Sequence, residues 1–287
     1  MMGELTLATR GSELALAQTA WVADRLRQTH PGLDVGMLIV ESSGDRDRIS
    51  PVAALTEMGA FVRSLQYAVL EGRADAAVHS CKDLPTDSPD GISIAAFPQR
   101  ANPFDVLIGA DLGDLARSAV IGTGSPRRRA QLSLLRPDVT FVELRGNIGT
   151  RIRKVREGNV DAAILAAAGL ERLGRDSDAA HYFTLETMIP APAQGSLAVE
   201  ATVESEAYGL LSAIDDPGVR LSAETERLVL SETGAGCRSA LGAYAVVSDS
   251  GITLHGFVDD EGEPRRFVAQ ASTSRAVVEE LVKGLKL

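Results

Sequence analysis

Short apolar runs alternate with amphipathic stretches along the first two-thirds of the chain, and this alternation predicts strands and helices in turn. The apolar run Leu5–Ala8 predicts a strand, and a helix follows from Ser12, a suitable N-cap, to about Thr29. Apolar positions at helical spacing predict another helix over Phe61–Glu71. Further strands are predicted at Val35–Val40, Ala74–His79, Val120–Gly122, Phe141–Leu144 and Leu197–Glu200.

The plan of the first part of the chain is repeated in the middle. Residues 71–78, EGRADAAV, are echoed by residues 157–164, EGNVDAAI, and each segment reads as a helix end, a glycine stop and a buried strand. A looser echo joins Thr9-Arg10-Gly11-Ser12 to Thr123-Gly124-Ser125, with a glutamine six residues beyond each serine. The repeat predicts two similar α/β lobes with a cleft between them.

The pattern changes after the breaker-rich segment 190–195, PAPAQG. A predicted helix, Leu221–Ser231, leads to the glycine-rich loop 234–237. Alternating strands and a final helix follow at Gly242–Val247, Ile252–Val258, Phe267–Ser272 and Ala276–Lys286. This tail predicts a small α+β domain. The strand Leu197–Glu200, before the tail, is predicted to return to the first lobe.

Composition restricts the class of protein. With 287 residues, 45% hydrophobic and 24% charged, the chain is long enough for two or three globular domains. A formal net charge of -10 argues against a nucleic-acid or anionic-membrane surface, so anion binding must be local. No signal peptide or bilayer-length apolar run is present, and we expect a cytoplasmic protein. Four scattered histidines and two distant cysteines indicate no metal site.

Basic and polar residues follow four predicted strands of the α/β region. They are Arg10 and Ser12, then Lys82 and Asp83, then Thr123, Ser125, Arg127 and Arg128, and finally Arg145 and Arg151. Ligands of open α/β sheets bind beyond the carboxyl ends of the strands, so we expect these groups to converge on a single sheet edge. Such an arrangement favours a ligand with several carboxylates or phosphates over scattered surface charge.

Individual motifs allow less specific interpretations. Ser125 and Pro126 suit the N-cap and first turn of a helix, and the spacing around them is not that of a P-loop. Asp83 is equally compatible with an exposed salt-paired turn and with a carboxylate that exchanges protons in a cleft. Cys81 is expected to be structural, whereas Cys237 lies in a loop that a ligand can approach closely.

Six segments, taken in order and with their spacing, resemble the hydroxymethylbilane synthase (porphobilinogen deaminase) family over nearly the whole chain. They are residues 7–15 (LATRGSELA), 79–85 (HSCKDLP), 122–128 (GTGSPRR), 144–151 (LRGNIGTR), 193–195 (AQG) and 236–237 (GC). The family carries lysines in a flexible loop before the position of Phe61, and the corresponding residues 53–59 contain none.

The resemblance implies three domains and a linear-tetrapyrrole synthase. Two α/β lobes like those of type II solute-binding proteins would be followed by a small α+β C-terminal domain. The expected limits are 1–96 with 196–214 for domain 1, 101–190 for domain 2 and 217–287 for domain 3. The implied reaction is the head-to-tail condensation of four porphobilinogen molecules, with release of ammonia, to hydroxymethylbilane.

The resemblance also implies a dipyrromethane cofactor joined by thioether to Cys237, and it assigns the site residues. Asp83, with Lys82 and Arg10, would be catalytic, assisting loss of the amino group and stabilising the cation that forms. The cofactor-binding set is Cys237, Asp83, Lys82, Ser125, Arg127, Arg128, Thr123, Gly146 and Gly236. The substrate-binding set is Arg10, Ser12, Phe61, Arg145, Arg151, Gln18 and Gln194.

The main alternative is a non-catalytic two-lobed carboxylate-binding protein. The Gly-Ala-Gly-Cys loop and the lack of an export signal count against it. No association helix is evident, and we expect a monomer whose partner is a small-molecule substrate.

Overall fold

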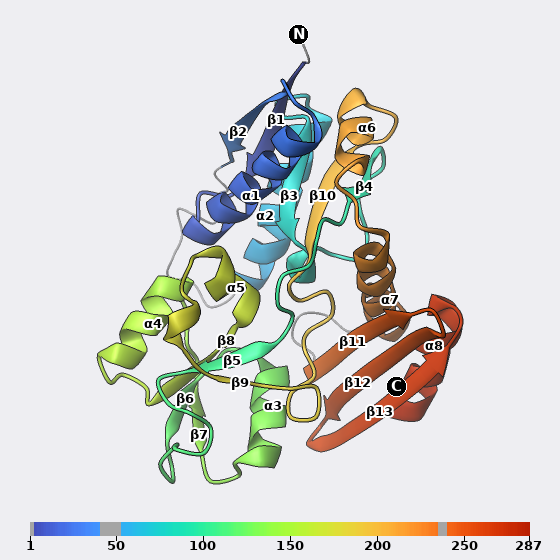
Figure 1. Cartoon of the computed structure of the whole chain (residues 1–287). Helices are drawn as coiled ribbons and strands as arrows, with labels where there is room; N and C mark the ends of the chain where they lie inside the picture. The colour runs from blue at the N-terminus through green and yellow to red at the C-terminus, as the bar shows by residue number, and fades with distance from the viewer. Residues whose placement is uncertain (1–2, 41–52, 235–239) are drawn as a thin grey trace. The chain divides into compact units, whose positions relative to one another are not determined.

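The computed structural model describes residues 3–40, 53–234 and 240–287, and residues 53–60 are described by their backbone only. The chain divides into two compact units, Met1–Arg100 with Ser196–Arg220 and Ala101–Gly195 with Leu221–Leu287. Each unit contains a five-stranded sheet, and the second unit also contains a three-stranded sheet (Figure 1).

The sheet of the first unit has the strand order β2-β1-β3-β10-β4. Its strands are β1 (Glu4–Thr9), β2 (Asp34–Ile39), β3 (Ala76–Ser80), β4 (Ile92–Ala96) and β10 (Leu197–Thr202). Strands β1, β2 and β3 run parallel, and β10 is antiparallel to both of its neighbours. The predicted return of the chain to the first lobe at Leu197 is therefore confirmed.

Two helices cover the two faces of this sheet, because successive side chains of a strand point to opposite sides. Helix α1 (Glu13–Thr29) packs Val22 and Leu26 against Leu5 and Leu7. Helix α2 (Ala53–Leu70) packs on the other face, in the cluster that contains Ala8. Helix α6 (Glu206–Ser212) adds Leu211 to the α1 side.

The large sheet of the second unit repeats this plan with the order β7-β6-β8-β5-β9. Its strands are β5 (Asp105–Ile108), β6 (Val120–Gly122), β7 (Thr140–Val142), β8 (Ala162–Ala166) and β9 (Ala179–Tyr182). Its helices are α3 (Pro126–Leu135), α4 (Ile148–Arg156) and α5 (Ala167–Arg172). Leu132 of α3 packs on one face, and Ile152 of α4 and Leu170 of α5 pack on the other.

The sequence repeat corresponds to equivalent positions in the two sheets. Gly72 and Gly158 both have a positive φ, of 69° and 73°, and each ends a helix before the third strand of its sheet order. Asp75 Oδ2 then accepts a hydrogen bond from the Thr6 amide at 2.7 Å, and Asp161 Oδ2 accepts one from the Val120 amide at 2.6 Å. The prediction of two similar α/β lobes is confirmed.

The C-terminal part of the chain forms an antiparallel sheet in the order β11-β12-β13, with a helix on one face. The strands are β11 (Ala240–Ser248), β12 (Gly251–Asp260) and β13 (Glu263–Ala271), and the helices are α7 (Pro217–Thr233) and α8 (Ser274–Leu285). Gly256 allows α8 to approach β12, since a Cβ there would lie 2.7 Å from Leu281. This α+β region belongs to the second compact unit, and the three-domain limits given above remain a prediction.

Two expectations need correction. The four basic junctions do not share one sheet edge, because β1 and β3 belong to one sheet and β6 and β7 to the other. Residues 53–59 are the first part of α2, eight residues earlier than the predicted helix start at Phe61. Alanine, leucine and methionine are good helix formers, and they extend the helix across Gly59.

Candidate functional site

In the first unit, two predicted junctions do lie at the same sheet edge. Strands β1 and β3 are parallel neighbours, with Leu7 opposite Ala76 and Ala8 opposite Ala77. The residues that follow the two strands therefore leave the sheet on the same side, and these are Arg10 after β1 and Lys82 and Asp83 after β3.

Arg10 and Phe61, which are 51 positions apart in the sequence, come together at this edge. The Arg10 guanidinium carbon lies 4.0 Å from the centroid of the Phe61 ring, and Phe61 itself is buried on α2. This cation–π contact fixes the direction of a half-buried arginine. Ser12, two residues on, caps α1 by accepting a hydrogen bond from the Ala15 amide at 3.3 Å.

Asp83 ends a single 3-10 turn, Cys81–Asp83, directly after β3. The Cys81 amide donates to the Ser196 carbonyl at 3.0 Å, and the Leu84 amide donates to the Cys81 carbonyl at 3.1 Å. Cys81 and Leu84 are buried, whereas Lys82 and Asp83 are half-buried. Two hydrogen bonds and the buried residues Cys81 and Leu84 thus anchor the turn, while its two charged side chains stay partly accessible. An exposed salt-paired turn would not require such anchoring.

Gln18 carries an amide that finds no partner among the described residues. Its Nε2 is buried and makes no hydrogen bond in that part of the chain, and the residue as a whole is 4% exposed. Gln131 occupies the equivalent position on α3, and there the amide is satisfied by both backbone groups of Ile189, at 2.8 and 3.0 Å. A buried donor without a partner is costly, so the Gln18 amide suits an acceptor on a ligand.

The second unit presents its junctions after β6 and β7, which are also parallel neighbours. Thr123 Oγ1 accepts a hydrogen bond from the Ser125 amide, and Ser125 caps α3 at the Arg128 amide. After β7, Gly146 adopts a positive φ of 115°, and its carbonyl accepts from Arg151 Nε at 2.8 Å. Arg145 is exposed and pairs with Glu143.

Arg127 and Arg128 are buried and share one carboxylate, that of Asp105 at the start of β5. Arg127 Nη1 lies 2.7 Å from Asp105 Oδ2, and Arg128 donates from Nε and Nη2 to Oδ1 at 2.9 and 2.7 Å. The guanidiniums also reach the main-chain carbonyls of Ile189 and Ile164. Two guanidinium charges against one carboxylate leave one positive charge in excess.

The charge state of this cluster follows from its surroundings. Burial raises the pKa of Asp105, but Arg127 and Arg128 outweigh the burial and hold the pKa well below its usual value. Burial lowers the pKa of Arg127, and the Asp105 carboxylate opposes that change. Asp105 is therefore a carboxylate at neutral pH, and it is paired with the buried guanidiniums of Arg127 and Arg128.

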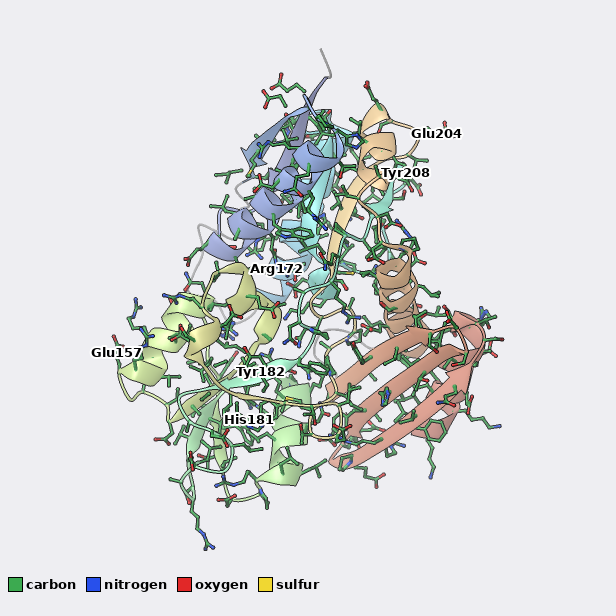
Figure 2. All side chains as sticks on the ribbon, in the orientation of Figure 1. Glu157, Arg172, His181, Tyr182, Glu204 and Tyr208 are labelled. Carbon is green, nitrogen blue, oxygen red and sulfur yellow. The ribbon has the colours of Figure 1, made fainter. Side chains whose placement is uncertain are left out.

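The segment 189–195 connects several of these groups. Gln194 Nε2 donates to Asp105 Oδ1 at 3.0 Å and to the Pro103 carbonyl at 2.7 Å. Arg172, labelled in Figure 2 at the end of α5, donates to the Gly195 carbonyl, and burial lowers its pKa to about 10. Gln194 therefore supports the Asp105 cluster. The sequence analysis expected Gln194 to contact substrate, and that contact remains a prediction.

Asp105 is the residue that sequence reasoning missed. The signal was present, because an aspartate stands at the head of the apolar run Val106–Ile108, and a carboxylate in a buried strand requires a cationic partner. Cys237 and Gly236 lie outside the described residues, so the structure does not place them. Cys81 is buried, as expected.

In the part of the chain that the structure describes, no group of three or more His, Cys, Asp or Glu side chains is arranged to hold a metal ion. Among the described helices, none combines the length and the apolar character needed to cross a bilayer.

Comparison with known proteins gives concordant results. Residues 5–208 match the family model of the porphobilinogen deaminase dipyrromethane cofactor-binding domain. A porphobilinogen deaminase of Roseiflexus castenholzii is 42% identical over 262 residues, covering 90% of this chain and 86% of its own. One of Lachnospira eligens is 40% identical over 291 residues, covering 98% of both chains. A probable porphobilinogen deaminase of Methanosarcina barkeri is 41% identical over 255 residues, with coverages of 88% and 80%.

Solved structures with a similar fold include the methionine-binding protein MetQ. It is 12% identical with a TM-score of 0.46, covering 78% of this chain and 94% of its own. A TRAP periplasmic solute-binding protein of Desulfovibrio salexigens is also 12% identical, with a TM-score of 0.45 and coverages of 75% and 73%.

Proposed function

The chain belongs to the porphobilinogen deaminase family, and from this premise we propose how its residues carry out the reaction of a hydroxymethylbilane synthase. This transferase joins four porphobilinogen molecules head to tail, releases ammonia at each addition and forms the linear tetrapyrrole hydroxymethylbilane. The single observation that carries the residue assignments is the buried Asp105–Arg127–Arg128 cluster with its excess positive charge.

The donor groups of the chain suit the dipyrromethane cofactor of the family. Each pyrrole of that cofactor bears two carboxylate arms, so it needs fixed cations and hydrogen-bond donors. The Arg127–Arg128 cluster supplies the cations, and the backbone amides at the start of α3 are among the donors. When it is bound, the cofactor supplies a covalently tethered pyrrole end to which substrate is added. Cys237 is the proposed point of attachment, through a thioether.

In the second unit, Arg127 and Arg128 hold carboxylate arms of the cofactor. Thr123 and Ser125 stand at the start of α3, where backbone amides add donors, and Gly146 lets the chain approach closely. Arg145 and Arg151 are more accessible, and they bind the arms of incoming substrate. Gln194 completes this set from its place beside Asp105.

In the first unit, Arg10 and Phe61 act together on substrate. The ring of Phe61 holds the guanidinium of Arg10 in one direction, which lowers the entropy lost when Arg10 binds a carboxylate. Ser12 at the N-terminus of α1 and Gln18 within α1 are proposed as hydrogen-bond donors to the substrate. Gly236 is proposed as part of the cofactor-binding set.

Asp83 is the proposed catalytic carboxylate, and it acts with Lys82 and with Arg10, which follows the neighbouring parallel strand β1. A carboxylate at Asp83 accepts hydrogen bonds from pyrrole N–H groups and stabilises positive charge as the amino group of porphobilinogen departs. The Asp83 carboxyl oxygens also hold the proton that passes to or from the reacting nitrogen. Lys82 and Arg10 bind carboxylate arms and offset the negative charge of those arms.

The mass of the intact purified protein tests the assignment of Cys237. We expect an excess over the sequence mass equal to two pyrrole units, and we expect Cys237→Ala to lack it. Cys81→Ser serves as the matched control, because it removes the other thiol and should keep the excess. A folded wild-type protein of unmodified mass would overturn the cofactor assignment. It would favour the alternative of a non-catalytic carboxylate-binding protein.

Cellular setting and assembly state follow from the same premise. We propose a cytoplasmic monomer whose partner is porphobilinogen, and no association with nucleic acid or membrane. Size-exclusion chromatography with light scattering measures the mass in solution, and a dimer mass would contradict this.

A further inference from the structure

A buried polar cluster in the first unit takes no part in the functions assigned above. Its centre is Glu200, which is 0% exposed in the middle of β10. Glu200 accepts hydrogen bonds from Gln66 Nε2 at 2.9 and 3.2 Å and from Ser88 Oγ at 3.0 Å. His79 Nε2 lies 3.0 Å from Glu200 Oε2.

Glu200 is ionised in this cluster. Burial raises its pKa, but the approach of His79 and the hydrogen bonds from Gln66 and Ser88 together bring the pKa below its usual value. A buried ionic cluster adds little net stability compared with apolar residues of similar volume. Since the cross-strand neighbours of Glu200 are Ala77 and Ile94, an apolar residue would suit the strand, and the carboxylate needs another explanation.

The contacts of Glu200 enclose the segment that carries Asp83. His79 lies on β3 four residues before Asp83, and Ser88 lies five residues after it. Glu200 therefore binds the segment on both sides of the catalytic turn. The same strand is linked to the turn itself, since the Cys81 amide donates to the carbonyl of Ser196, which directly precedes β10.

The cluster also includes a residue of α2, the helix that carries Phe61. Gln66 lies on α2, five residues after Phe61, and Phe61 is the ring that orients Arg10. One carboxylate thus fixes β3, the segment after Asp83 and α2 relative to one another. The first two flank the turn that carries Lys82 and Asp83, and α2 contributes Phe61 to the proposed site.

We propose that Glu200 is a positioning residue, which holds the Asp83 turn in its catalytic place through His79 and Ser88. This inference rests on the proposed function, because it takes the role of Asp83 from there. A displacement of about 1 Å at a reacting group can lower a rate by up to about 100-fold. Loosening the segment should therefore slow the reaction step more than it weakens substrate binding.

Ser88 gives the cleanest test, because it is exposed and its replacement spares the core. Ser88→Ala removes the donor to Glu200, and Ser88→Thr keeps a hydroxyl. Thr86→Ala is the matched control: Thr86 is exposed in the same segment and is not among the donors to Glu200 in the described residues. For each protein we would measure kcat, KM, the cofactor content by intact mass and the thermal midpoint Tm.

We expect Ser88→Ala to lower kcat about 3-fold or more, which corresponds to about 0.6 kcal/mol or more of activation free energy. KM should change by less than about 2-fold. Ser88→Thr should restore kcat, and Thr86→Ala should match wild type. Glu200→Gln, which keeps the shape and removes the charge, should lower kcat about 10-fold or more while the mass excess remains.

Wild-type kcat in Ser88→Ala, with or without a lowered Tm, would overturn the proposal and leave the cluster a purely structural one. If Glu200→Gln does not fold, the Ser88 pair alone decides. Failure of the proposed function is a separate result, because it would show in the wild-type protein as no turnover of porphobilinogen and no mass excess.

Discussion

At the scale of single residues, Asp83 gives the sharpest functional prediction. Asp83→Asn keeps the size of the side chain and removes the negative charge, so it should lower porphobilinogen turnover by about 100-fold or more. Folding and the mass excess should be unchanged, because the turn is held by Cys81 and Leu84. Consumption of porphobilinogen and the intact mass measure the two effects.

The control for this variant is Asp87→Asn, an exposed carboxylate in the same segment, which should retain full turnover. Turnover close to wild type in Asp83→Asn would remove Asp83 from its catalytic role.

Asp105 belongs to the residue scale as well, and its contribution to stability should depend on pH. Its pKa is lowered in the folded protein relative to 3.8, so the stabilisation is fully present above that value and is lost as the pH falls through the folded pKa. Asp105→Asn leaves two buried guanidiniums without their carboxylate, and it should cost about 3–5 kcal/mol at neutral pH.

Urea denaturation of both proteins over a series of pH values measures this contribution. The difference in unfolding free energy between wild type and Asp105→Asn should shrink as the pH falls below 3.8. A difference that stays constant as the pH falls well below 3.8 would mean that the carboxylate charge is not what holds the cluster.

How far single residues were predictable depended on their neighbours in sequence. Arg10, Lys82, Asp83 and Ser125 stand directly after apolar strands, and that position alone predicted a functional edge. The partners of the site residues, such as Asp105 and Glu200, were not predictable as partners. Their contacts come from strands far away in the chain, and the local pattern records only that an acid stands in an apolar run.

At the scale of elements, the segment before β10 should be intolerant of a side chain at Gly195. Its φ is 87°, and a Cβ would lie 2.5 Å from the Ala101 carbonyl oxygen. Gly195→Ala should therefore destabilise the protein by more than about 1 kcal/mol. Gly209 in α6 is exposed with open space around it, so Gly209→Ala should be neutral or stabilising. Tm values of the two variants give the comparison, and equal values would refute this account of Gly195.

Element positions were best predicted where the local signals agreed. Helix α1 begins after its serine cap and continues to Thr29, as periodicity predicted. Helix α2 begins at Ala53, before the predicted start at Phe61, because the alanine, leucine and methionine residues of 53–58 favour a helix. Strand β7 is Thr140–Val142, shifted toward the N-terminus from the predicted Phe141–Leu144, since Leu144 instead packs against Gly122.

At the scale of the whole molecule, we predict that the cofactor stabilises the fold. A group that binds only the folded state raises Tm by mass action, and a tethered one acts at high effective concentration. Cys237→Ala should melt several degrees below the wild-type protein. As a control, wild-type protein prepared without the cofactor should recover its Tm when porphobilinogen is added, and Cys237→Ala should not. Equal midpoints for all forms would show that the cofactor makes no net contribution.

The arrangement of junctions in two sheets was the main feature that the linear sequence concealed. Four strand ends with basic residues predicted one sheet edge, whereas β1 and β3 belong to one sheet and β6 and β7 to another. Apolar runs state that strands are buried but not which strands pair, because pairing depends on long-range contacts. The internal repeat was the better guide, since a repeated supersecondary unit predicts two lobes rather than one longer sheet.

The position of β10 in the strand order has a consequence for synthesis on the ribosome. Strand β10 lies between β3 and β4, so the first sheet lacks an inner strand until residue 202 has emerged. The second sheet needs only residues 105–182, which leave the ribosome earlier. The lobe translated second can therefore close first, and the nascent N-terminal lobe waits with β4 unpaired, exposed to chaperones and to misfolding.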